Sequence, residues 1–349
     1  MEAMGKALMQ ELDWKMREAK GPVSTVYFGG GTPSLFDLSQ LELLVSRCLA
    51  AGTHPSEITL EANPEDITDE RLKAWLAMGI TRLSIGVQTF DDDRLQWMNR
   101  AHSSQQAVDA ILSAHALGFQ HLSADLIYGL PDRKMPFAHD LEKACGLPVD
   151  HLSAYILTVE DQTALGRNVQ KGLEHVAPES LVEAEYALLC SRAKEAGFDH
   201  YEVSNFARSG GHAQHNQHYW TGLPFLGIGP GAHGFDGQQR LANVSNNPRY
   251  IAALEKAQSL NELPVERDVL SANDRYNEGL MTGLRTAKGI DVEALENEYG
   301  HNPQTEDPDF WSQCIADRTL EPIGGSRYRI RAERWLVADR IASAFFVVD

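Results

Sequence analysis

The sequence predicts an α/β protein built around parallel strands, and three observations support this. Short apolar, β-branched segments alternate with segments of helical periodicity over residues 1–175. The linkers between them are only a few residues long, which is typical of parallel strands joined by right-handed crossovers. Polar residues close successive apolar strands, so we expect the carboxyl ends of the strands to share one functional mouth.

The elements of this first part follow in chain order. Met4, Leu8, Leu12 and Met16 recur at helical spacing and predict an opening amphipathic helix. Apolar composition predicts strands over 25–28, 56–63, 82–90, 121–131 and 151–159. Helical patterns cover 38–50, 68–79 and 103–119, the second beginning at a Thr cap and ending at Gly, and the third beginning at a Ser cap.

Past residue 175 the alternation stops. We expect a helix over 184–198, a single strand over 200–207, and an irregular stretch rich in Gly and His over 211–235. From about residue 265 the chain is polar and helical, and 327–345 is expected to form a short strand pair and a helix. The predicted division is therefore a barrel over 1–175, its continuation with the His-rich segment over 176–264, and a small winged-helix-like α+β domain over 265–349.

Composition limits the function classes. The formal charge of −18 disfavours a nucleic-acid surface and an acidic membrane leaflet. No apolar run reaches the roughly 18 residues of a membrane span, and charged residues interrupt the N-terminus, so we expect a cytoplasmic protein. The four cysteines are far apart, and we expect reduced, buried thiols with no metal-ligand spacing: Cys48, Cys145, Cys190 and Cys314.

Three consecutive glycines follow the first predicted strand, in the sequence GGGTPS of residues 29–34. Glycines between a strand and a helix let backbone N–H groups approach a ligand, and the following helix N-terminus favours an anion. The segment has neither the P-loop nor the dinucleotide-binding pattern. A tight structural turn is the equally weighted alternative on these residues alone.

Six motifs occur in the order and spacing of one family: YFGGGTPS, EITLEANPEDIT, RLSIGVQTFDDDRLQWMNRAH, SADLIYGLP, HLSAYILT, and HYEVSNFA followed by HNQHYW and FLGIGPGAHG. The chain resembles the radical S-adenosylmethionine proteins related to oxygen-independent coproporphyrinogen III oxidase, and within them the haem-chaperone branch. The resemblance covers nearly the whole chain. It implies a partial radical SAM (β/α) barrel followed by a small C-terminal domain.

The resemblance also implies roles for particular residues. The glycine turn of the family holds the amino group of S-adenosylmethionine, which here falls on Gly30, Gly31 and Thr32. The other positions that match the family's cofactor residues are Glu61, Gln88, Arg100 and Asp125. Their chemistry suits the cofactor, because a carboxylate pairs with an ammonium, an arginine holds a carboxylate, and amide or carboxylate oxygens bind ribose hydroxyls. Taken singly, each has an ordinary surface or capping role as its alternative.

The family places CxxxCxxC after its first barrel strand, where the thiolates hold a [4Fe–4S] cluster. This sequence has no such motif, and its first predicted strand resembles the second strand of the family. The two explanations are an N-terminally truncated sequence, which we favour because the cofactor residues remain, and a natural loss of the cluster. We therefore expect the cluster only in the intact family form, no metal ligands in this chain, and no radical catalysis from it alone.

The pattern HNxxYW, formed by His215, Asn216, Tyr219 and Trp220, resembles the signature of the haem-chaperone branch. It makes His215 the first candidate for haem contact, because imidazole can ligate haem iron and the aromatic rings offer flat apolar surface. A hydrogen-bonded structural histidine is the favoured alternative. Zinc binding by His212 and His218 is less expected, since no thiol or carboxylate accompanies them at metal spacing.

The leading hypothesis is a chaperone that binds haem and S-adenosylmethionine and delivers haem to client proteins such as membrane respiratory enzymes. The first alternative is an oxygen-independent coproporphyrinogen III oxidase of porphyrin biosynthesis, and the second is a cluster-free binding protein. No nucleic-acid partner is expected. A homodimer that pairs the exposed edge strand is a further expectation.

Overall fold

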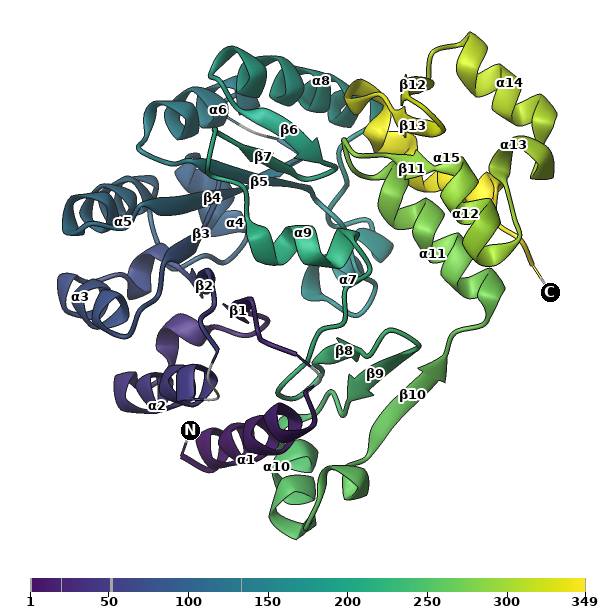
Figure 1. Cartoon of the computed structure of the whole chain (residues 1–349). Coiled ribbons are helices and arrows are strands. Elements are labelled where there is room, and N and C mark those ends of the chain that lie inside the picture. Colours follow the sequence, from purple (N-terminus) through teal and green to yellow (C-terminus); the bar gives the residue numbers. More distant parts are fainter. Residues whose placement is uncertain (1, 20, 51–52, 133, 349) are drawn as a thin grey trace.

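A curled seven-stranded sheet forms the centre of the computed structural model, which describes residues 2–19, 21–50, 53–132 and 134–348. The strands lie in the order β1-β2-β3-β4-β5-β7-β6. Their bounds are Thr25–Phe28 (β1), Glu57–Ala62 (β2), Arg82–Gln88 (β3), His121–Tyr128 (β4), His151–Ile156 (β5), Asp199–Glu202 (β6) and Asn205–Ala207 (β7). The first five are parallel, and β7 and β6 add an antiparallel edge. The sheet is a half-barrel that opens toward the viewer's right in Figure 1.

Helices cover the outer, convex face of this sheet (Figure 1). They are α2 (Leu38–Ala50), α3 (Asp69–Ala77), α5 (Ser104–Leu117), α6 (Phe137–Gly146) and α8 (Glu179–Glu195). The buried core between sheet and helices contains Leu60, Trp75, Leu83, Ile111 and Leu126. The predicted caps are confirmed, since the Thr68 side chain accepts the N–H of Arg71 and Ser103 forms a capping box with Gln106.

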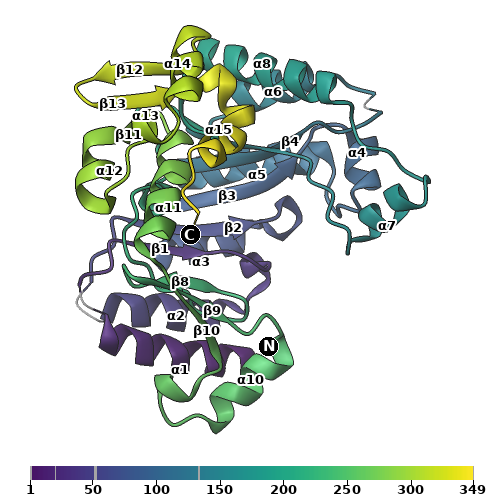
Figure 2. The same ribbon diagram turned by 90° about the vertical axis from the view of Figure 1, so that its right-hand side faces the viewer.

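The remaining parts of this region lie on the open side of the half-barrel. A second sheet, in the order β10-β9-β8, joins His233–Phe235 (β8), Gln239–Asn243 (β9) and Val265–Val269 (β10). Helix α1 (Glu2–Glu18) packs against α10 (Asn247–Lys256) below this sheet, as Figure 2 shows. Two short helices, α4 (Asp92–Trp97) and α7 (Ala164–Gln170), follow β3 and β5.

The C-terminal region is a small α+β unit with the winged-helix-like order expected from the sequence. Its helices are α11 (Ala272–Leu284), α12 (Val292–Tyr299), α13 (Pro303–Glu306), α14 (Pro308–Ala316) and α15 (Ala338–Ala344). Its strands are β11 (Ile290–Asp291), β12 (Leu320–Gly324) and β13 (Arg327–Ile330), in the order β11-β13-β12. The divisions predicted at residues 175 and 264 stay predictions.

Three sequence expectations are wrong in detail. Residues 327–345 were expected to contain a strand pair, but only β13 lies there, and its partner β12 precedes this range. Residues 200–207 were expected as one strand, but β6 and β7 form an antiparallel hairpin that turns at Val203 and Ser204. The stretch 211–235 was expected to be irregular, but it contains helix α9 (Gln214–Trp220) and strand β8. Helix α9 lies inside the half-barrel, against β1 (Figure 1).

Among the helices that the structure describes, none combines the length and apolarity that crossing a bilayer requires.

Candidate functional site

The strands of the half-barrel alternate between an apolar outer face and a polar inner face. In β3, Leu83, Ile85 and Val87 point into the core, whereas the residues between them line a cavity. The same alternation holds in β2, β4 and β5, and the inner residues of all four strands are Thr59, Glu61, Arg82, Ser84, Gly86, Gln88, Ser123, Asp125, Ile127, His151, Ser153 and Tyr155. Parallel strands that are covered on both faces are usually apolar throughout. A polar inner face therefore indicates a lumen that holds a polar ligand.

This cavity has a volume of about 480 Å³, which suits a cofactor-sized molecule. It contains six of the seven residues predicted to bind S-adenosylmethionine: Gly31, Thr32, Glu61, Gln88, Arg100 and Asp125. The seventh, Gly30, contacts Glu61 of this cavity through its backbone N–H. Three polar residues at or just after strand ends line the cavity as well: Asn63, Tyr155 and Thr158.

The glycine turn holds Glu61 at the mouth. The Gly30 N–H donates to Glu61 Oε2 at 3.1 Å, and the Tyr27 hydroxyl donates to Glu61 Oε1 at 2.7 Å. Gly30 has a φ of +88°, which disfavours any side chain there. A Cβ on Gly29 would meet the Tyr27 ring and lie 2.7 Å from Glu61 Oε1, whereas a Cβ on Gly31 would meet nothing within 4 Å. The turn thus combines one tight packing position with one open position.

Arg100 and Gln88 lie side by side above Gly86. Arg100 Nη2 donates to Asn63 Oδ1 at 2.7 Å, and its Nε is buried without a hydrogen-bond partner. A register shift between Ile85 and Gln88 marks an irregularity at the end of β3, and Gln88 has a φ of +67°. Strained backbone of this kind costs about 1–3 kcal/mol and is common at ligand sites.

Asp125 lies in the middle of the cavity among hydroxyl groups. Ser84 Oγ donates to both carboxylate oxygens, at 3.0 and 2.9 Å, and Ser123 Oγ donates to Oδ1 at 3.1 Å. Burial raises the pKa of Asp125 to about 7, against the opposing effect of these hydrogen bonds. This carboxyl group can therefore change its protonation state near neutral pH.

His215 is held outside the cavity wall by strand β1. Its Nδ1 lies 2.9 Å from Thr25 Oγ1, its Nε2 lies 3.0 Å from the Tyr219 hydroxyl, and its ring stacks on Tyr27 at 5.0 Å. Burial lowers the pKa of His215 to about 4, so the imidazole is neutral at pH 7. Both ring nitrogens have partners, so ligation of a metal through Nε2 requires Tyr219 to move.

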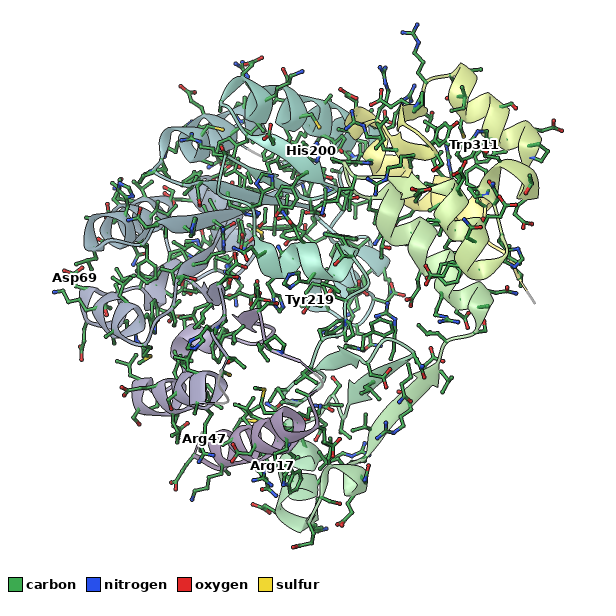
Figure 3. The ribbon with its side chains drawn as sticks, viewed as in Figure 1. Arg17, Arg47, Asp69, His200, Tyr219 and Trp311 are labelled. Carbon is green, nitrogen blue, oxygen red and sulfur yellow. The ribbon has the colours of Figure 1, made fainter. Side chains whose placement is uncertain are left out.

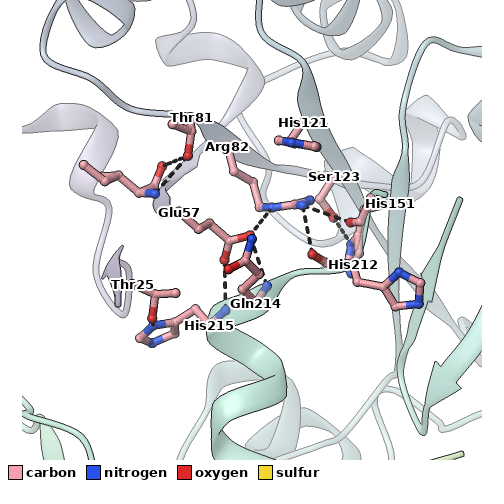
Figure 4. A network of polar contacts seen from close by, with 12 residues as sticks. Thr25, Glu57, Thr81, Arg82, His121, Ser123, His151, His212, Gln214 and His215 are labelled. Atoms are coloured by element: carbon pink, nitrogen blue, oxygen red, sulfur yellow. Dashed lines mark hydrogen bonds and ion pairs between the residues drawn. The ribbon is translucent and has the colours of Figure 1, made fainter. Parts of the chain in front are cut away.

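A buried ion pair positions the helix that carries His215 (Figure 4). Glu57 Oε1 and Oε2 accept the backbone N–H groups of His215 and Gln214, at 2.9 and 3.1 Å. Arg82 Nε donates to Glu57 Oε2 at 2.9 Å, and its Nη2 donates to the carbonyl oxygen of Gly211. Arg82 and Glu57 are 2% and 3% exposed. A carboxylate on β2 therefore provides the cap that the sequence around α9 lacks.

An aromatic surface extends from His215 to the outside. Tyr219 packs edge-on against His215 and against Phe225, with ring centroids 5.0 and 4.8 Å away. Tyr219 lies at the centre of the open side of the half-barrel in Figure 3 and is 45% exposed. Leu223 and Leu226 are 49% and 45% exposed. These residues together offer apolar area next to the candidate histidine.

The described residues provide no site for a resident metal. No three His, Cys, Asp or Glu side chains come together there in an arrangement that could hold a metal ion. The four cysteines are free. An iron–sulfur cluster therefore has no ligand set among these residues.

Sequence reasoning missed the lower part of the cavity, which contains Tyr27, Arg82, Ser84, Ser123 and His151. A signal was present, because every second residue of RLSIGVQ, HLSADLIY and HLSAYI is polar or glycine, with Ile127 as the exception. That alternation identifies a sheet with one polar face.

Comparisons with known proteins point to one family. The model of the radical SAM superfamily matches residues 7–143, and that of the HemN C-terminal domain matches residues 270–320. The chain is 34% identical to the haem chaperone HemW of Bacillus subtilis, covering 85% of this chain and 79% of that protein. It is 38% identical to the haem chaperone HemW of Mycobacterium tuberculosis, covering 83% and 74% of the two chains.

The fold is also found among solved structures. Coproporphyrinogen III oxidase (HemN) from Escherichia coli, a radical SAM enzyme, superposes with a TM-score of 0.82 over 99% of this chain and 83% of that chain. The two sequences are 20% identical, so this likeness establishes the fold alone.

Proposed function

This chain belongs to the HemW family of the radical SAM superfamily, and we propose that it binds haem and S-adenosylmethionine and passes haem to client proteins. The observation that carries the proposal is the position of His215. The helix with the HNxxYW pattern packs against β1, the strand whose Tyr27 also contacts Glu61 of the cavity. A haem surface and a cofactor cavity then share one wall.

Several features support S-adenosylmethionine as the cavity ligand. Glu61 suits the ammonium group, and the free Nε of Arg100 suits a carboxylate. Asp125 and Gln88 suit ribose hydroxyls. Thr59 Oγ1 is buried in the cavity wall without a partner, so a polar ligand would satisfy it. S-adenosylmethionine would supply a nucleotide and a sulfonium; the residues of this chain bind and orient it.

The proposed haem surface consists of α9 and the loop that follows it. The neutral imidazole of His215 can approach iron once Tyr219 turns away, and the exposed apolar side chains of Leu223 and Leu226 would lie under the macrocycle. Because that surface is open rather than enclosed, haem held there remains accessible to an acceptor. Clients that need haem, including membrane respiratory enzymes, belong to the same proposal, as do a cytoplasmic location and a homodimer.

The test is haem titration followed by transfer. Purified protein is titrated with haemin while the Soret band is recorded, and the complex is then mixed with apomyoglobin. Saturable one-to-one binding and transfer faster than from serum albumin are the expected results. Absence of saturable binding would overturn the proposed function. Binding of S-adenosylmethionine is measured separately by calorimetry, so its result does not depend on the haem titration.

A further inference from the structure

A chain of hydrogen-bonding side chains leads from the cavity across β5 to β6. Ser123 Oγ contacts Asp125 Oδ1 at 3.1 Å and His151 Nδ1 at 2.8 Å. His151 Nε2 lies 2.7 Å from the Tyr201 hydroxyl. Ser123 and His151 are 2% and 1% exposed, whereas Tyr201 is partly exposed. The Tyr201 oxygen also accepts the backbone N–H of Ala213, so the chain connects the central carboxyl group to a partly exposed residue of β6.

With Asp125 ionised, every hydrogen bond in the chain points toward the cavity. The Tyr201 O–H donates to His151 Nε2, the His151 Nδ1–H donates to Ser123, and the Ser123 O–H donates to the carboxylate. Ser123 also lies 3.2 Å from Ser153 Oγ, which can donate to it. One donated and two accepted bonds fill the capacity of the Ser123 hydroxyl.

With Asp125 protonated, the same contacts hold with every direction reversed. The carboxyl O–H then donates to Ser123, Ser123 donates to His151 Nδ1, and His151 Nε2–H donates to Tyr201. The change moves one proton along each link. Tyr201 gives its own proton to His151 and takes a replacement proton from water. No heavy atom needs to move, and His151 changes its tautomer without gaining charge.

The surroundings favour such a concerted shift. Burial, together with the nearby Arg82 and His212, holds the pKa of His151 well below its usual range, so the ring does not become charged on the way. Burial likewise raises the pKa of Tyr201, which faces Glu202, Glu57 and Arg82, so no tyrosinate persists.

Asp125 is the group in the chain that titrates near neutrality, at a pKa of about 7. The ionisable groups that face it are Glu61 on β2, Tyr27 on β1 and Tyr155 on β5, and its hydrogen-bonding neighbours are Ser84, Ser123 and Ser153. All three ionisable neighbours are acids, so none of them stabilises the carboxylate.

We propose that Ser123, His151 and Tyr201 form a proton path that connects Asp125 to the partly exposed Tyr201 on β6, and that this path reverses its direction when Asp125 binds a proton. The path goes beyond the proposed function, since it requires neither haem nor S-adenosylmethionine. The path would let Asp125 lose its proton while a hydroxyl-bearing ligand covers the mouth of the cavity. The ionised form matters there, because the carboxylate, unlike the protonated acid, accepts hydroxyl hydrogen bonds with both oxygens.

The test reads the tautomer of His151 directly. The full chain, labelled with nitrogen-15 at its 13 histidines and with carbon-13 at the aspartate carboxyl groups, is followed by NMR across the range around pH 7. His151→Gln assigns the signal by its loss. We expect the Nδ1–H tautomer at high pH and the Nε2–H tautomer at low pH, with the midpoint of the Asp125 carboxyl titration.

Variants separate a path from ordinary packing. Asp125→Asn mimics the neutral acid and should hold His151 in the Nε2–H form at every pH. Ser153→Ala is the matched control, because Ser153 has no hydrogen bond to His151. It removes a hydrogen bond that lowers the pKa of Asp125, so the reversal should remain with its midpoint at a higher pH. Tyr201→Phe should keep the Nδ1–H form throughout, since Nε2–H would be a buried donor without an acceptor.

Two results would overturn the proposal. One is a His151 tautomer that stays fixed while Asp125 titrates in the unmodified chain. The other is a tautomer that still follows pH in Asp125→Asn, which folds with the same backbone signals as the parent. Binding of haem or S-adenosylmethionine enters neither result, so failure of the path and failure of the proposed function are distinguishable.

Discussion

The ring of Tyr27 stacks on the imidazole of His215, with 5.0 Å between centroids and 23° between planes. The Tyr27 hydroxyl at the same time donates to Glu61 at 2.7 Å. One side chain therefore contacts both the candidate haem ligand and the candidate ammonium site. Tyr27 lies on the edge strand β1, so the position of this strand sets both contacts.

Replacing Tyr27 by Phe separates these two contacts. The ring and its stacking on His215 remain, while Glu61 loses a donor, and a hydrogen bond to a charged group is worth about 1.5–3 kcal/mol. We expect weaker binding of S-adenosylmethionine by calorimetry and unchanged haem titration. Tyr27→Ala should weaken both. Equal effects of Phe and Ala on haem binding would contradict the stacking role.

The glycine turn gives a matched pair of substitutions. Gly29→Ala places a methyl group against the Tyr27 ring and Glu61, and overpacking of this kind costs about 1–3 kcal/mol. Gly31→Ala meets nothing in the protein but projects at the cavity. Urea unfolding should show a loss of stability for Gly29→Ala only, while ligand titration should show weaker binding for both. A destabilised Gly31→Ala would be inconsistent with the open position described.

Glu57 is expected to dominate the stability of the His-bearing segment. Glu57→Ala leaves the buried Arg82 with only the more distant carboxylate of Asp150, 3.9 Å from its Nη1, and removes the acceptors of two α9 N–H groups. Removing one partner of a buried ion pair costs about 3–5 kcal/mol. The control is Arg47→Gln, which breaks the more exposed pair with Asp13 and should cost about 0–1 kcal/mol. Chemical denaturation measures both, and similar losses would refute the distinction.

Glu202 makes the protein less stable as the pH rises. Burial raises its pKa from 4.5 to about 7, and its Oε1 has no hydrogen-bond partner. Between these values the unfolded chain releases a proton that the folded chain keeps, so the free energy of unfolding falls by about 3 kcal/mol as the pH rises from 4.5 to 7. Glu202→Gln should match the parent near pH 4.5 and exceed it above pH 7. A difference that is the same at both pH values would disprove this assignment.

His215 and His218 lie on the same short helix, so substitutions of the two can be compared in their effect on haem binding. His215→Ala should weaken haem binding at least tenfold, or about 1.4 kcal/mol, whereas His218→Ala should leave it nearly unchanged. Because the pKa of His215 is about 4, we expect the affinity to stay constant as the pH falls from neutrality and to drop only near that value. Soret titrations at several pH values check this, and a midpoint near the ordinary histidine value of 6.5 would argue against His215.

The elements that sequence reasoning predicted correctly are those fixed by local signals. Thr68 and Ser103 mark helix starts, because each side chain accepts the N–H of the residue three positions later. The strands of the half-barrel follow from apolar runs between short linkers. The mouth residues Glu61 and Asp125 were predicted because parallel strands bring their carboxyl ends to one edge. The cofactor roles of these residues stay predictions.

Helix α9 could not be predicted because its stabilisation is not local. Its first residue follows Ala213, which has no capping side chain, and its N–H groups are bonded by Glu57, 157 residues earlier in the chain. The β6–β7 hairpin was missed for a related reason. Its turn at Val203 and Ser204 contains neither Gly nor Pro, and the pairing of β7 with β5 decides the bend.

The carboxylate of Glu57 also determines how α9 moves. A seven-residue helix without a buried residue would ordinarily open and close by itself, and its amides would exchange with solvent quickly. Here the N–H groups of Gln214 and His215 are bonded to Glu57 on β2, a strand that is paired on both sides within the sheet. Their hydrogen exchange is therefore tied to the opening of β2, so the histidine helix and the cofactor cavity belong to one cooperative unit.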